Sequence, residues 1–447
     1  MFVKIQKFLI LGASKSGRWA TKYLLSKNAT CYVYEELKSP KIDETIKELQ
    51  ELGANVVTRN QLETLLAEID VVIISPGVPI NHEIAVKAKA MGKRIIGELE
   101  FGFGQFTPPI IAVTGTNGKT TTVSLIDSIL KKAGIKSELV GNVGVPITSK
   151  LCDIDRDTVC VAEVSSFQLE SVNALCPHVA CVLNIAPDHL ERHYSMENYI
   201  YLKKRLLKNQ RESEYSVLNF DDATVKSFFS ETRGKVIWVS TKEKVDGAYR
   251  ENGKLCFKGE YIVDENELRL KGMHNICDTL FAIATAKVLG VDNQSISTAL
   301  KSFNGIRHRV EFVCEKHGVK YYNDSKATNT ASTMVALDSV LEPTVLILGG
   351  SEKGESYKAL FEKIKVSSVK HVILTGASRY NMLSVASDLG ITDVTVTQDF
   401  FFAIKIAKLI AHGGDSVLLS PACASFDQFG SYEERGDAFI RAVEEGD

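Results

Sequence analysis

The sequence has no marked excess of charge of either sign. Its 53 Lys and Arg residues nearly balance 55 Asp and Glu residues, for a formal net charge of −2. A nucleic-acid-binding surface is normally a basic patch or stripe, and no block of like charge provides one. The short basic run Lys203-Lys204-Arg205 falls in a stretch that we predict to be helical. We therefore expect no nucleic-acid partner.

Long apolar runs and paired cysteines are also missing. No stretch approaches the ~20 apolar residues that a membrane-spanning helix needs. The run Phe8–Leu11 is short and leads into Gly12, so we interpret it as a first strand and not as a signal peptide. The nine cysteines form no C-x-x-C pair, which is typical of buried thiols in a reducing compartment and excludes a disulfide framework or a zinc site. We expect a cytoplasmic protein without membrane contact.

Size and patterning predict three domains of the α/β class. A chain of 447 residues corresponds to about three domains of ~150 residues each. Short apolar strands alternate with helical stretches, which indicates doubly wound, mostly parallel sheets. In the middle of the chain, Lys242–Lys271 changes to short alternating segments, as in a small antiparallel flap. We place the domains at 1–97, 98–305 and 306–447.

The segment Thr114–Thr120, Thr-Gly-Thr-Asn-Gly-Lys-Thr, is the clearest sign of chemistry. It follows the apolar run Ile110–Val113 and opens an amphipathic stretch, so it reads as strand, tight turn and helix start. Such a turn directs backbone N–H groups and a helix N-terminus at a polyphosphate. The usual G-x-x-x-x-G-K-[ST] pattern would place glycine at position 113, where Val113 stands. A plain strand–helix turn is the alternative interpretation, and we favour the phosphate loop because Gly-Lys-Thr follows.

Two further strand ends carry polar side chains. Glu163 stands at the end of the mainly apolar run Val159–Glu163. The pair Asp188-His189 comes shortly after a second apolar run, Ala180–Leu183. A carboxylate there suits Mg²⁺, which prefers oxygen ligands, although a salt-bridged structural role for Glu163 stays open. His189 and His193 have the spacing H-x-E-x-H, with the glutamate misplaced for a zinc protease, and we reject that function.

Other turns are candidates without being decisive. The turn Gly12–Gly17 lacks the G-x-G-x-x-G pattern, so it is either a diphosphate site or a plain βα turn. Asp324–Asn329 follows a predicted strand and is either a helix cap or a ligand site. Ser420–Ser425 is a loop of small residues that admits a ligand or simply turns.

Together these segments resemble the Mur ligase family of peptidoglycan synthesis. The resemblance covers nearly the whole chain, and the motifs Asn323–Asn329 and Ser420–Phe429 are similar to the branch that adds D-glutamate. The other matching segments are the phosphate loop, Gly141–Gly144, Glu163–Glu170, Asp188–His193, Gly272–Asn275 and His308-Arg309.

The resemblance implies an ATP-dependent amide ligase that acts on UDP-N-acetylmuramoyl-L-alanine and D-glutamate. ATP would phosphorylate the substrate carboxylate, and the amine of D-glutamate would displace phosphate from the acyl phosphate through a tetrahedral intermediate. The first domain would hold the UDP end, the second ATP and the third D-glutamate. Two Mg²⁺ ions, replaceable by Mn²⁺, are the implied metals, and we expect a monomer.

The resemblance also implies roles for individual residues. Lys119, His189 and Lys203 are the implied catalytic residues, with Lys203 at the position of a carbamylated lysine. Lys204 competes for that assignment, and a solvated helix lysine is the alternative. Metal ligation is implied for Thr120, Glu163, His189 and carbamylated Lys203. ATP would contact Gly115, Thr116, Asn117, Gly118, Lys119, Thr120, Thr121, Asn275, Asp278, Arg309 and Asp324; the UDP substrate Ser14, Lys15, Ser16, Ser75, Gly77, Asn142 and Gln168; and D-glutamate Thr328, Lys353, Ser425 and Tyr432.

Some positions depart from the family pattern. Asp278 stands where the family often has asparagine, and a carboxylate donates no amide hydrogen bond. Glu35 and Glu36 lie where some relatives carry hydroxyl or basic residues near the UDP, so we expect them to point away from the diphosphate or to meet the uracil or ribose. The alternatives are another ligase of the superfamily, such as a folylpolyglutamate-synthase-like enzyme, and a nucleotide-dependent binding module.

Overall fold

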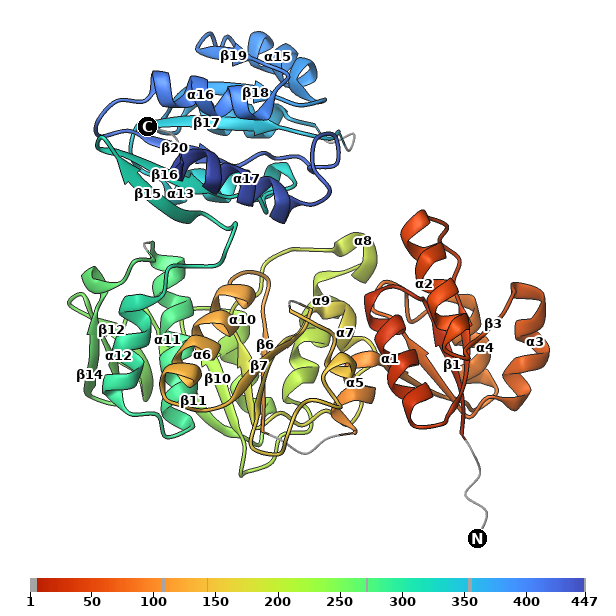
Figure 1. Cartoon of the computed structure of the whole chain (residues 1–447). Coiled ribbons are helices and arrows are strands. Elements are labelled where there is room, and N and C mark those ends of the chain that lie inside the picture. The colour runs from red at the N-terminus through yellow and green to blue at the C-terminus, as the bar shows by residue number, and fades with distance from the viewer. Residues whose placement is uncertain (1–5, 106–108, 143, 271, 353–355, 446–447) are drawn as a thin grey trace. The chain divides into compact units, whose positions relative to one another are not determined.

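The structure is a computed structural model that describes residues 6–105, 109–142, 144–270, 272–352 and 356–445. It separates into two compact units, one formed by Met1–Leu268 with Met273–Ser302 and the other by Arg269–Gly272 with Phe303–Asp447. The first unit contains a five-stranded and a nine-stranded sheet, and the second contains a six-stranded sheet (Figure 1).

The N-terminal sheet is entirely parallel, in the order β3-β2-β1-β4-β5. The chain thus starts in the centre of the sheet and winds outward in both directions, as in dinucleotide-binding folds. The first strand is almost wholly buried, because helices cover it. The elements are β1 (Lys7–Leu11), α1 (Lys15–Ser26), β2 (Thr30–Tyr34), α2 (Pro40–Glu51), β3 (Asn55–Val56), α3 (Arg59–Glu68), β4 (Val71–Ile74), α4 (Glu83–Ala90) and β5 (Arg94–Gly97).

Helices α2 and α3 were not predicted from the apolar pattern, yet the sequence of each begins with residues typical of a helix N-terminus. The Ser39 hydroxyl accepts a hydrogen bond from the Ile42 N–H, and Pro40 occupies the first turn. Thr58 and Gln61 form a capping box at the start of α3. These are the usual residue types at helix N-termini, so the caps announce helices that apolar periodicity alone does not.

The central sheet has the order β14-β13-β12-β11-β10-β9-β6-β8-β7. Strands β6 to β11 are parallel to their neighbours, and β12, β13 and β14 pair antiparallel. Its strands are β6 (Ile110–Thr114), β7 (Ser137–Gly141), β8 (Val159–Glu163), β9 (Val179–Val182), β10 (Tyr215–Asn219), β11 (Lys235–Ser240), β12 (Gly247–Glu251), β13 (Lys254–Phe257) and β14 (Glu260–Asp264).

The predicted antiparallel flap is present as strands β12 to β14, but it is not a separate layer. Strand β12 pairs with β11 in parallel, so the flap extends the edge of the main sheet. Helix α11 contacts both the phosphate-loop helix α6 and the strands β11 to β13, which joins the extension to the nucleotide side of the sheet. The helices are α5 (Glu98–Phe103), α6 (Lys119–Lys132), α7 (Ser166–Leu169), α8 (Leu190–His193), α9 (Met196–Lys204), α10 (Ala223–Ser227), α11 (Met273–Val288) and α12 (Asn293–Ser302).

The C-terminal sheet has the order β15-β16-β20-β17-β18-β19 and is parallel except for the edge hairpin β15–β16. Helices lie on both faces, over two separate apolar clusters. The elements are β15 (Glu311–Lys316), β16 (Val319–Asn323), α13 (Thr330–Ser339), β17 (Thr344–Gly349), α14 (Lys358–Lys365), β18 (Val369–Thr375), α15 (Arg379–Asp388), β19 (Val394–Val396), α16 (Phe400–Ile410), β20 (Ser416–Leu419) and α17 (Tyr432–Glu444).

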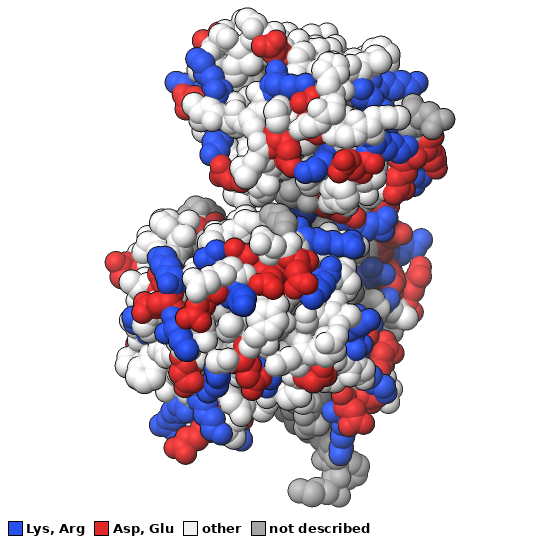
Figure 2. Space-filling view, turned by 90° about the vertical axis from the view of Figure 1, so that its left-hand side faces the viewer, with Lys and Arg blue, Asp and Glu red and all other residues white. Residues whose placement is uncertain are grey.

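The predicted fold class, three doubly wound α/β sheets with a mixed central sheet, is confirmed. Among the described residues, no helix combines the length and apolarity needed to cross a bilayer. On the face shown in Figure 2, basic and acidic side chains are interspersed.

Candidate active site

The topology of the central sheet brings three predicted site segments together. Strand β6 lies between β8 and β9, with Val113 opposite Glu163 and Thr114 opposite Val182. The carboxyl ends of parallel neighbours meet at one edge of the sheet. The phosphate loop after β6, Glu163 at the end of β8 and Asn184 after β9 therefore share that edge. The prediction that the ends of these strands lie beside the loop is confirmed for Glu163 and for the start of the segment after β9, and the placement of Asp188 and His189 there stays a prediction.

The phosphate loop uses its glycines for backbone conformation. Gly118 has φ 82° and Gly115 has φ 157°, both in the region that favours glycine. Gly118 is the N-cap of α6, so the free N–H groups of the first turn point out of the loop. Lys119 Nζ donates to the carbonyls of Gly115, at 2.9 Å, and Thr116, at 2.8 Å. Its charge is thus held at the mouth of the turn.

Asn184 and Tyr199 brace this loop from two sides. The Asn117 N–H donates to Asn184 Oδ1 at 2.8 Å, and Asn184 Nδ2 returns a bond to the Asn117 carbonyl at 3.2 Å. The Tyr199 hydroxyl lies 3.0 Å from Thr116 Oγ1. Sequence reasoning missed both residues. The position of Asn184 directly after a buried strand was the available signal, whereas Tyr199 had none beyond lying one turn before Lys203.

Asp278 in α11 lies against the turn of the loop. A Cβ built on Gly118 would stand 2.2 Å from Asp278 Oδ1, and the carboxylate is 4% exposed. The predicted ATP-site residue Asp278 is thus brought to the phosphate loop. A side chain at position 118 would force the buried Asp278 carboxylate to shift.

We expect Gly118→Ala to lower the free energy of unfolding by about 2–4 kcal/mol, because a left-handed φ and a clash add together. Gly134→Ala is the matched control: Gly134 ends the same helix with φ 76° and nothing within 4 Å of its Cβ position, so it should cost only about 1 kcal/mol. Urea unfolding of both variants measures the difference. Equal losses would show that Asp278 exerts no steric constraint.

Glu163 is a buried carboxylate with two partners. It is 2% exposed; Oε2 accepts from Thr120 Oγ1 at 2.8 Å and Oε1 from Asn142 Nδ2 at 2.7 Å. No ion pair with a described basic residue neutralises it, so the salt-bridged alternative finds no support. The arrangement places an anionic oxygen beside the hydroxyl that follows the loop lysine, which suits a hard cation.

Lys203 in α9 contacts the same loop from the interior of the domain. Its side chain is 1% exposed, and Nζ donates to the Gly115 carbonyl at 2.7 Å. Burial lowers the pKa of Lys203 to about 7, and the charge of Lys119 adds to the effect. Lys204, the competing residue, instead pairs with Glu231 at 2.5 Å near the surface. The solvated-lysine alternative is therefore wrong for Lys203.

The two histidines of the H-x-E-x-H segment diverge. His189 is about half exposed with Nε2 3.6 Å from Asp188 Oδ2, and its φ is 52°. His193 is buried, with Nε2 2.9 Å from Ser166 Oγ. Phe167 packs between the rings, 4.9 Å and 5.4 Å from their centroids. Within the described residues, no group of three His, Cys, Asp or Glu side chains is arranged around a common metal position.

Residues predicted for the UDP end cluster at the first βα turn. Ser14, Lys15 and Ser16 open α1, and Ser75 Oγ donates to the Gly12 carbonyl at 2.8 Å, tying the loop after β4 to this turn. Lys15 Nζ donates to the Gly144 carbonyl at 2.6 Å. The exposed Gly77 follows in the same loop.

Glu35 and Glu36, which follow β2, accept hydrogen bonds from groups of the protein itself. Glu35 accepts from the Ala13 N–H at 2.7 Å and from the Leu37 N–H at 2.8 Å. Glu36 accepts from the Tyr34 hydroxyl at 2.8 Å. Glu35 therefore occupies one N–H of the turn that would face a diphosphate.

Asn142 and Gln168 are engaged within the central domain. Asn142 donates to Glu163, as above, and buried Gln168 closes a capping box by accepting from the Ser165 N–H at 2.9 Å. The structure thus shows a helix-capping contact for Gln168, and its predicted contact with the substrate stays a prediction.

In the second unit, Asp324 directly follows β16 and is a buried carboxylate. Oδ2 accepts from Ser420 Oγ at 2.7 Å and Oδ1 from the Val310 N–H at 3.2 Å. Burial raises the pKa of Asp324 to about 7, and the bond from Ser420 offsets part of the shift. Arg309 is exposed two residues beyond Arg307.

The predicted D-glutamate residues lie on loops after strands of this sheet. Thr328 follows β16, and the buried Ser425 follows β20. Tyr432 starts α17, and its ring centroid lies 5.9 Å from Lys326 Nζ. Lys353 lies outside the described residues.

We expect the pH dependence of unfolding to report Asp324. A carboxyl group whose pKa is higher in the folded state than in the unfolded state stabilises the folded state at low pH. This contribution is complete below the unfolded pKa of about 4 and is lost as pH rises through the folded pKa of about 7. Asp324→Asn does not titrate there, so its stability relative to wild type should rise by about 1–3 kcal/mol between pH 4.5 and pH 8. Urea unfolding at both pH values measures this, with the exposed Asp388→Asn as control. A difference that stays constant with pH would contradict the assignment.

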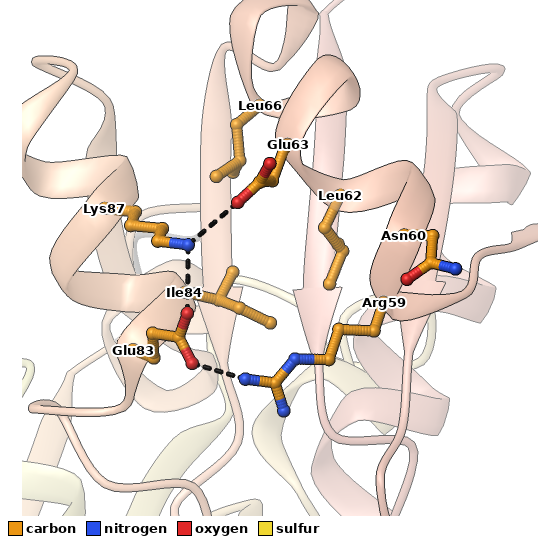
Figure 3. A pocket seen from close by; sticks show the side chains of 8 residues that line it. All are labelled: Arg59, Asn60, Leu62, Glu63, Leu66, Glu83, Ile84 and Lys87. Carbon is orange, nitrogen blue, oxygen red and sulfur yellow. Dashed lines mark hydrogen bonds and ion pairs between the residues drawn. The ribbon is translucent and has the colours of Figure 1, made fainter.

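A charged groove in the N-terminal domain lies apart from the predicted residues. Its lining between α3 and α4 includes the apolar side chains of Leu62, Leu66 and Ile84. Arg59 pairs with Glu83, and Lys87 pairs with both Glu63 and Glu83 (Figure 3). Its charged side chains are mutually paired, so no charge is left over for a ligand.

Three family models match the chain in succession. They are the MurD-like N-terminal domain over residues 6–97, the Mur ligase middle domain over 113–286 and the Mur ligase, glutamate ligase domain over 308–423. Among solved structures, UDP-N-acetylmuramate-alanine ligase of Thermotoga maritima is 17% identical with a TM-score of 0.59, covering 98% of this chain and 99% of that chain. That similarity shows the fold.

Full-length relatives are closer in sequence. The UDP-N-acetylmuramoylalanine--D-glutamate ligase of Caldanaerobacter subterraneus subsp. tengcongensis is 37% identical and covers 99% of each chain. That of Pelotomaculum thermopropionicum is 39% identical over 98% of this chain and 97% of the relative. Since these similarities and the three domain matches agree, this chain belongs to the Mur ligase family.

Proposed function

We propose that this chain is an ATP-dependent ligase that joins D-glutamate to UDP-N-acetylmuramoyl-L-alanine in peptidoglycan precursor synthesis. The observation that carries the proposal is the group Lys119, Thr120, Glu163 and Lys203 at one sheet edge. The relatives named for this reaction match over 99% and 97% of their length.

The chemistry needs an anion to attack another anion. The substrate carboxylate must approach the γ-phosphate of ATP, so the site has to neutralise charge and hold the groups in line. The loop N–H groups and Lys119 receive the phosphates. An oxygen of the carboxylate bonds to the γ-phosphorus as the bond to ADP breaks, which gives the acyl phosphate and releases ADP. The D-glutamate amine then attacks the acyl carbon and loses a proton, and the C–O bond to phosphate breaks as the tetrahedral intermediate collapses.

The residues present fit a divalent cation at this edge. Glu163 offers anionic oxygens that hydroxyl and amide donors already orient, and Thr120 adds a hydroxyl directly after the loop lysine. We assign Mg²⁺, with Mn²⁺ as a substitute, to Thr120 and Glu163, and a second ion to His189 with Lys203. When bound, such ions neutralise phosphate charge. Because the protein supplies few ligands, phosphate oxygens and water would complete the coordination of such ions.

Lys203 fits carbamylation. The reaction joins a neutral amine to CO₂ and releases a proton, so it needs an amine that is unprotonated near neutral pH. A pKa of about 7, caused first by burial, provides that amine. The product is an anion where the unmodified side chain is a cation.

In this proposal, each of the three domains binds a different substrate. We assign the UDP end to 1–97, through Ser14 to Ser16, Ser75 and Gly77; ATP to 98–305; and D-glutamate to 306–447. We also assign Asn275, Arg309 and Asp324 to the nucleotide, and Asn142 and Gln168 to the muramoyl part. Thr328, Lys353, Ser425 and Tyr432 are assigned to D-glutamate.

Phosphate release from ATP with a panel of amino acids tests the proposal. With UDP-N-acetylmuramoyl-L-alanine present, D-glutamate should accelerate release, whereas L-glutamate, L-lysine and buffer should not. Equal release with all four additions would count against D-glutamate ligation.

A further inference from the structure

A buried arginine in α17 joins the loops at one end of the C-terminal sheet. Arg435 is 2% exposed. Its Nε donates to Ser325 Oγ at 2.9 Å, Nη2 to the carbonyls of Ser325, at 2.9 Å, and Cys423, at 3.0 Å, and Nη1 to the Ala424 carbonyl at 3.2 Å. All of these acceptors are neutral oxygens.

The acceptors belong to loops that follow neighbouring strands. Ser325 lies two residues after β16, and Cys423 and Ala424 follow β20; the two strands are parallel neighbours, with Asn323 opposite Leu419. A third loop also reaches the guanidinium, because a Cβ on Gly350, after β17, would stand 3.1 Å from Nη1. The guanidinium therefore lies where three strand-end loops meet.

The charge of Arg435 has no adjacent counterion. Within the described residues, no carboxylate lies at ion-pair distance from its guanidinium, and Asp324 and Asp427 act on it only from farther away. Burial lowers the pKa of Arg435 to about 10, so the group is still protonated at neutral pH. An uncompensated buried charge is costly, and its hydrogen bonds to oriented carbonyls offset only part of the cost.

The loops held by Arg435 carry the residues that the proposed function assigns to D-glutamate. Thr328 lies three residues after Ser325, and Ser425 directly follows Ala424. We propose that Arg435 is the positioning residue of the amino-acid site, fixing these loops and placing a positive charge behind them that favours a dicarboxylic amino acid. The inference rests on the proposed function.

A purely structural latch predicts something different. Loss of a latch lowers the folded fraction, or shifts every kinetic constant together. Loss of a positioning cation raises the KM for D-glutamate and leaves the KM for ATP and for the UDP substrate nearly unchanged, because only the amino acid depends on this charge.

Three variants separate these possibilities. Arg435→Met keeps an unbranched apolar stem and removes the charge, Arg435→Lys keeps the charge without the fork of donors, and Arg441→Met removes an exposed arginine from the same helix. We expect Arg435→Met to raise the KM for D-glutamate by about 30-fold and Arg435→Lys by about fivefold. Arg441→Met should stay within about twofold of wild type in all three KM values.

The outcomes are distinct. A D-glutamate KM for Arg435→Met equal to that of Arg441→Met, or a parallel rise of all three KM values, overturns the inference while the proposed function stands. Absence of D-glutamate-dependent phosphate release in wild type overturns both. If thermal melting shows that Arg435→Met is unfolded, Arg435→Lys decides by the same selective rise in KM.

Discussion

Lys203→Ala is expected to abolish ligation, lowering kcat by about a thousandfold or more. The variant removes a buried lysine that donates to the Gly115 carbonyl of the phosphate loop at 2.7 Å. It also removes the amine proposed to take up CO₂. Added bicarbonate should therefore restore nothing.

Lys204→Ala is the matched control for this experiment. Lys204 is adjacent in sequence, but its side chain pairs with Glu231 near the surface. A surface pair of this kind contributes at most about 1 kcal/mol, so kcat should stay near the wild-type value. Full activity of folded Lys203→Ala would remove the proposed role.

Glu163→Gln is expected to have the second large effect. Glutamine has the same shape as glutamate. Its amide oxygen can accept the hydrogen bond from Thr120, and its amide N–H can donate to Asn142 once the Asn142 amide group flips, so the fold should persist. The anionic oxygen is lost, and with it the proposed metal ligand. We expect kcat to fall by about a thousandfold and the Mg²⁺ concentration for half-maximal activity to rise at least about tenfold.

Glu138→Gln provides the comparison. Glu138 lies on the adjacent strand β7 and pairs with Lys150 at 3.2 Å, outside the phosphate loop. Its Mg²⁺ dependence should match wild type. An unchanged Mg²⁺ requirement in Glu163→Gln would contradict the assignment of a cation to this carboxylate.

The site residues at the ends of strands could be predicted from the sequence. The side chains that contact them from other segments of the chain could not. Apolar runs ending in polar residues placed Glu163 and the phosphate loop at the same edge, because parallel strands share their polarity. No such rule indicates that Asn184 clamps Asn117 or that Tyr199 bonds Thr116. These contacts depend on how the segments pack.

Arg435 illustrates the same limit in the other unit. As one charged residue in a helix rich in Glu and Arg, it has the pattern of a solvated position. Only the close approach of the loops after β16 and β20 buries it. The helices α2 and α3, in contrast, were predictable from their caps, since capping depends on local sequence alone.

The fate of the oxygen atoms of the substrate carboxylate tests the central claim most directly. If the carboxylate attacks ATP at this site, UDP-N-acetylmuramoyl-L-alanine labelled with ¹⁸O in its carboxyl group should transfer one ¹⁸O to each phosphate released with D-glutamate, as seen by mass spectrometry. Phosphate without the label would show that the carboxylate and the γ-phosphate never become bonded, and would contradict the account.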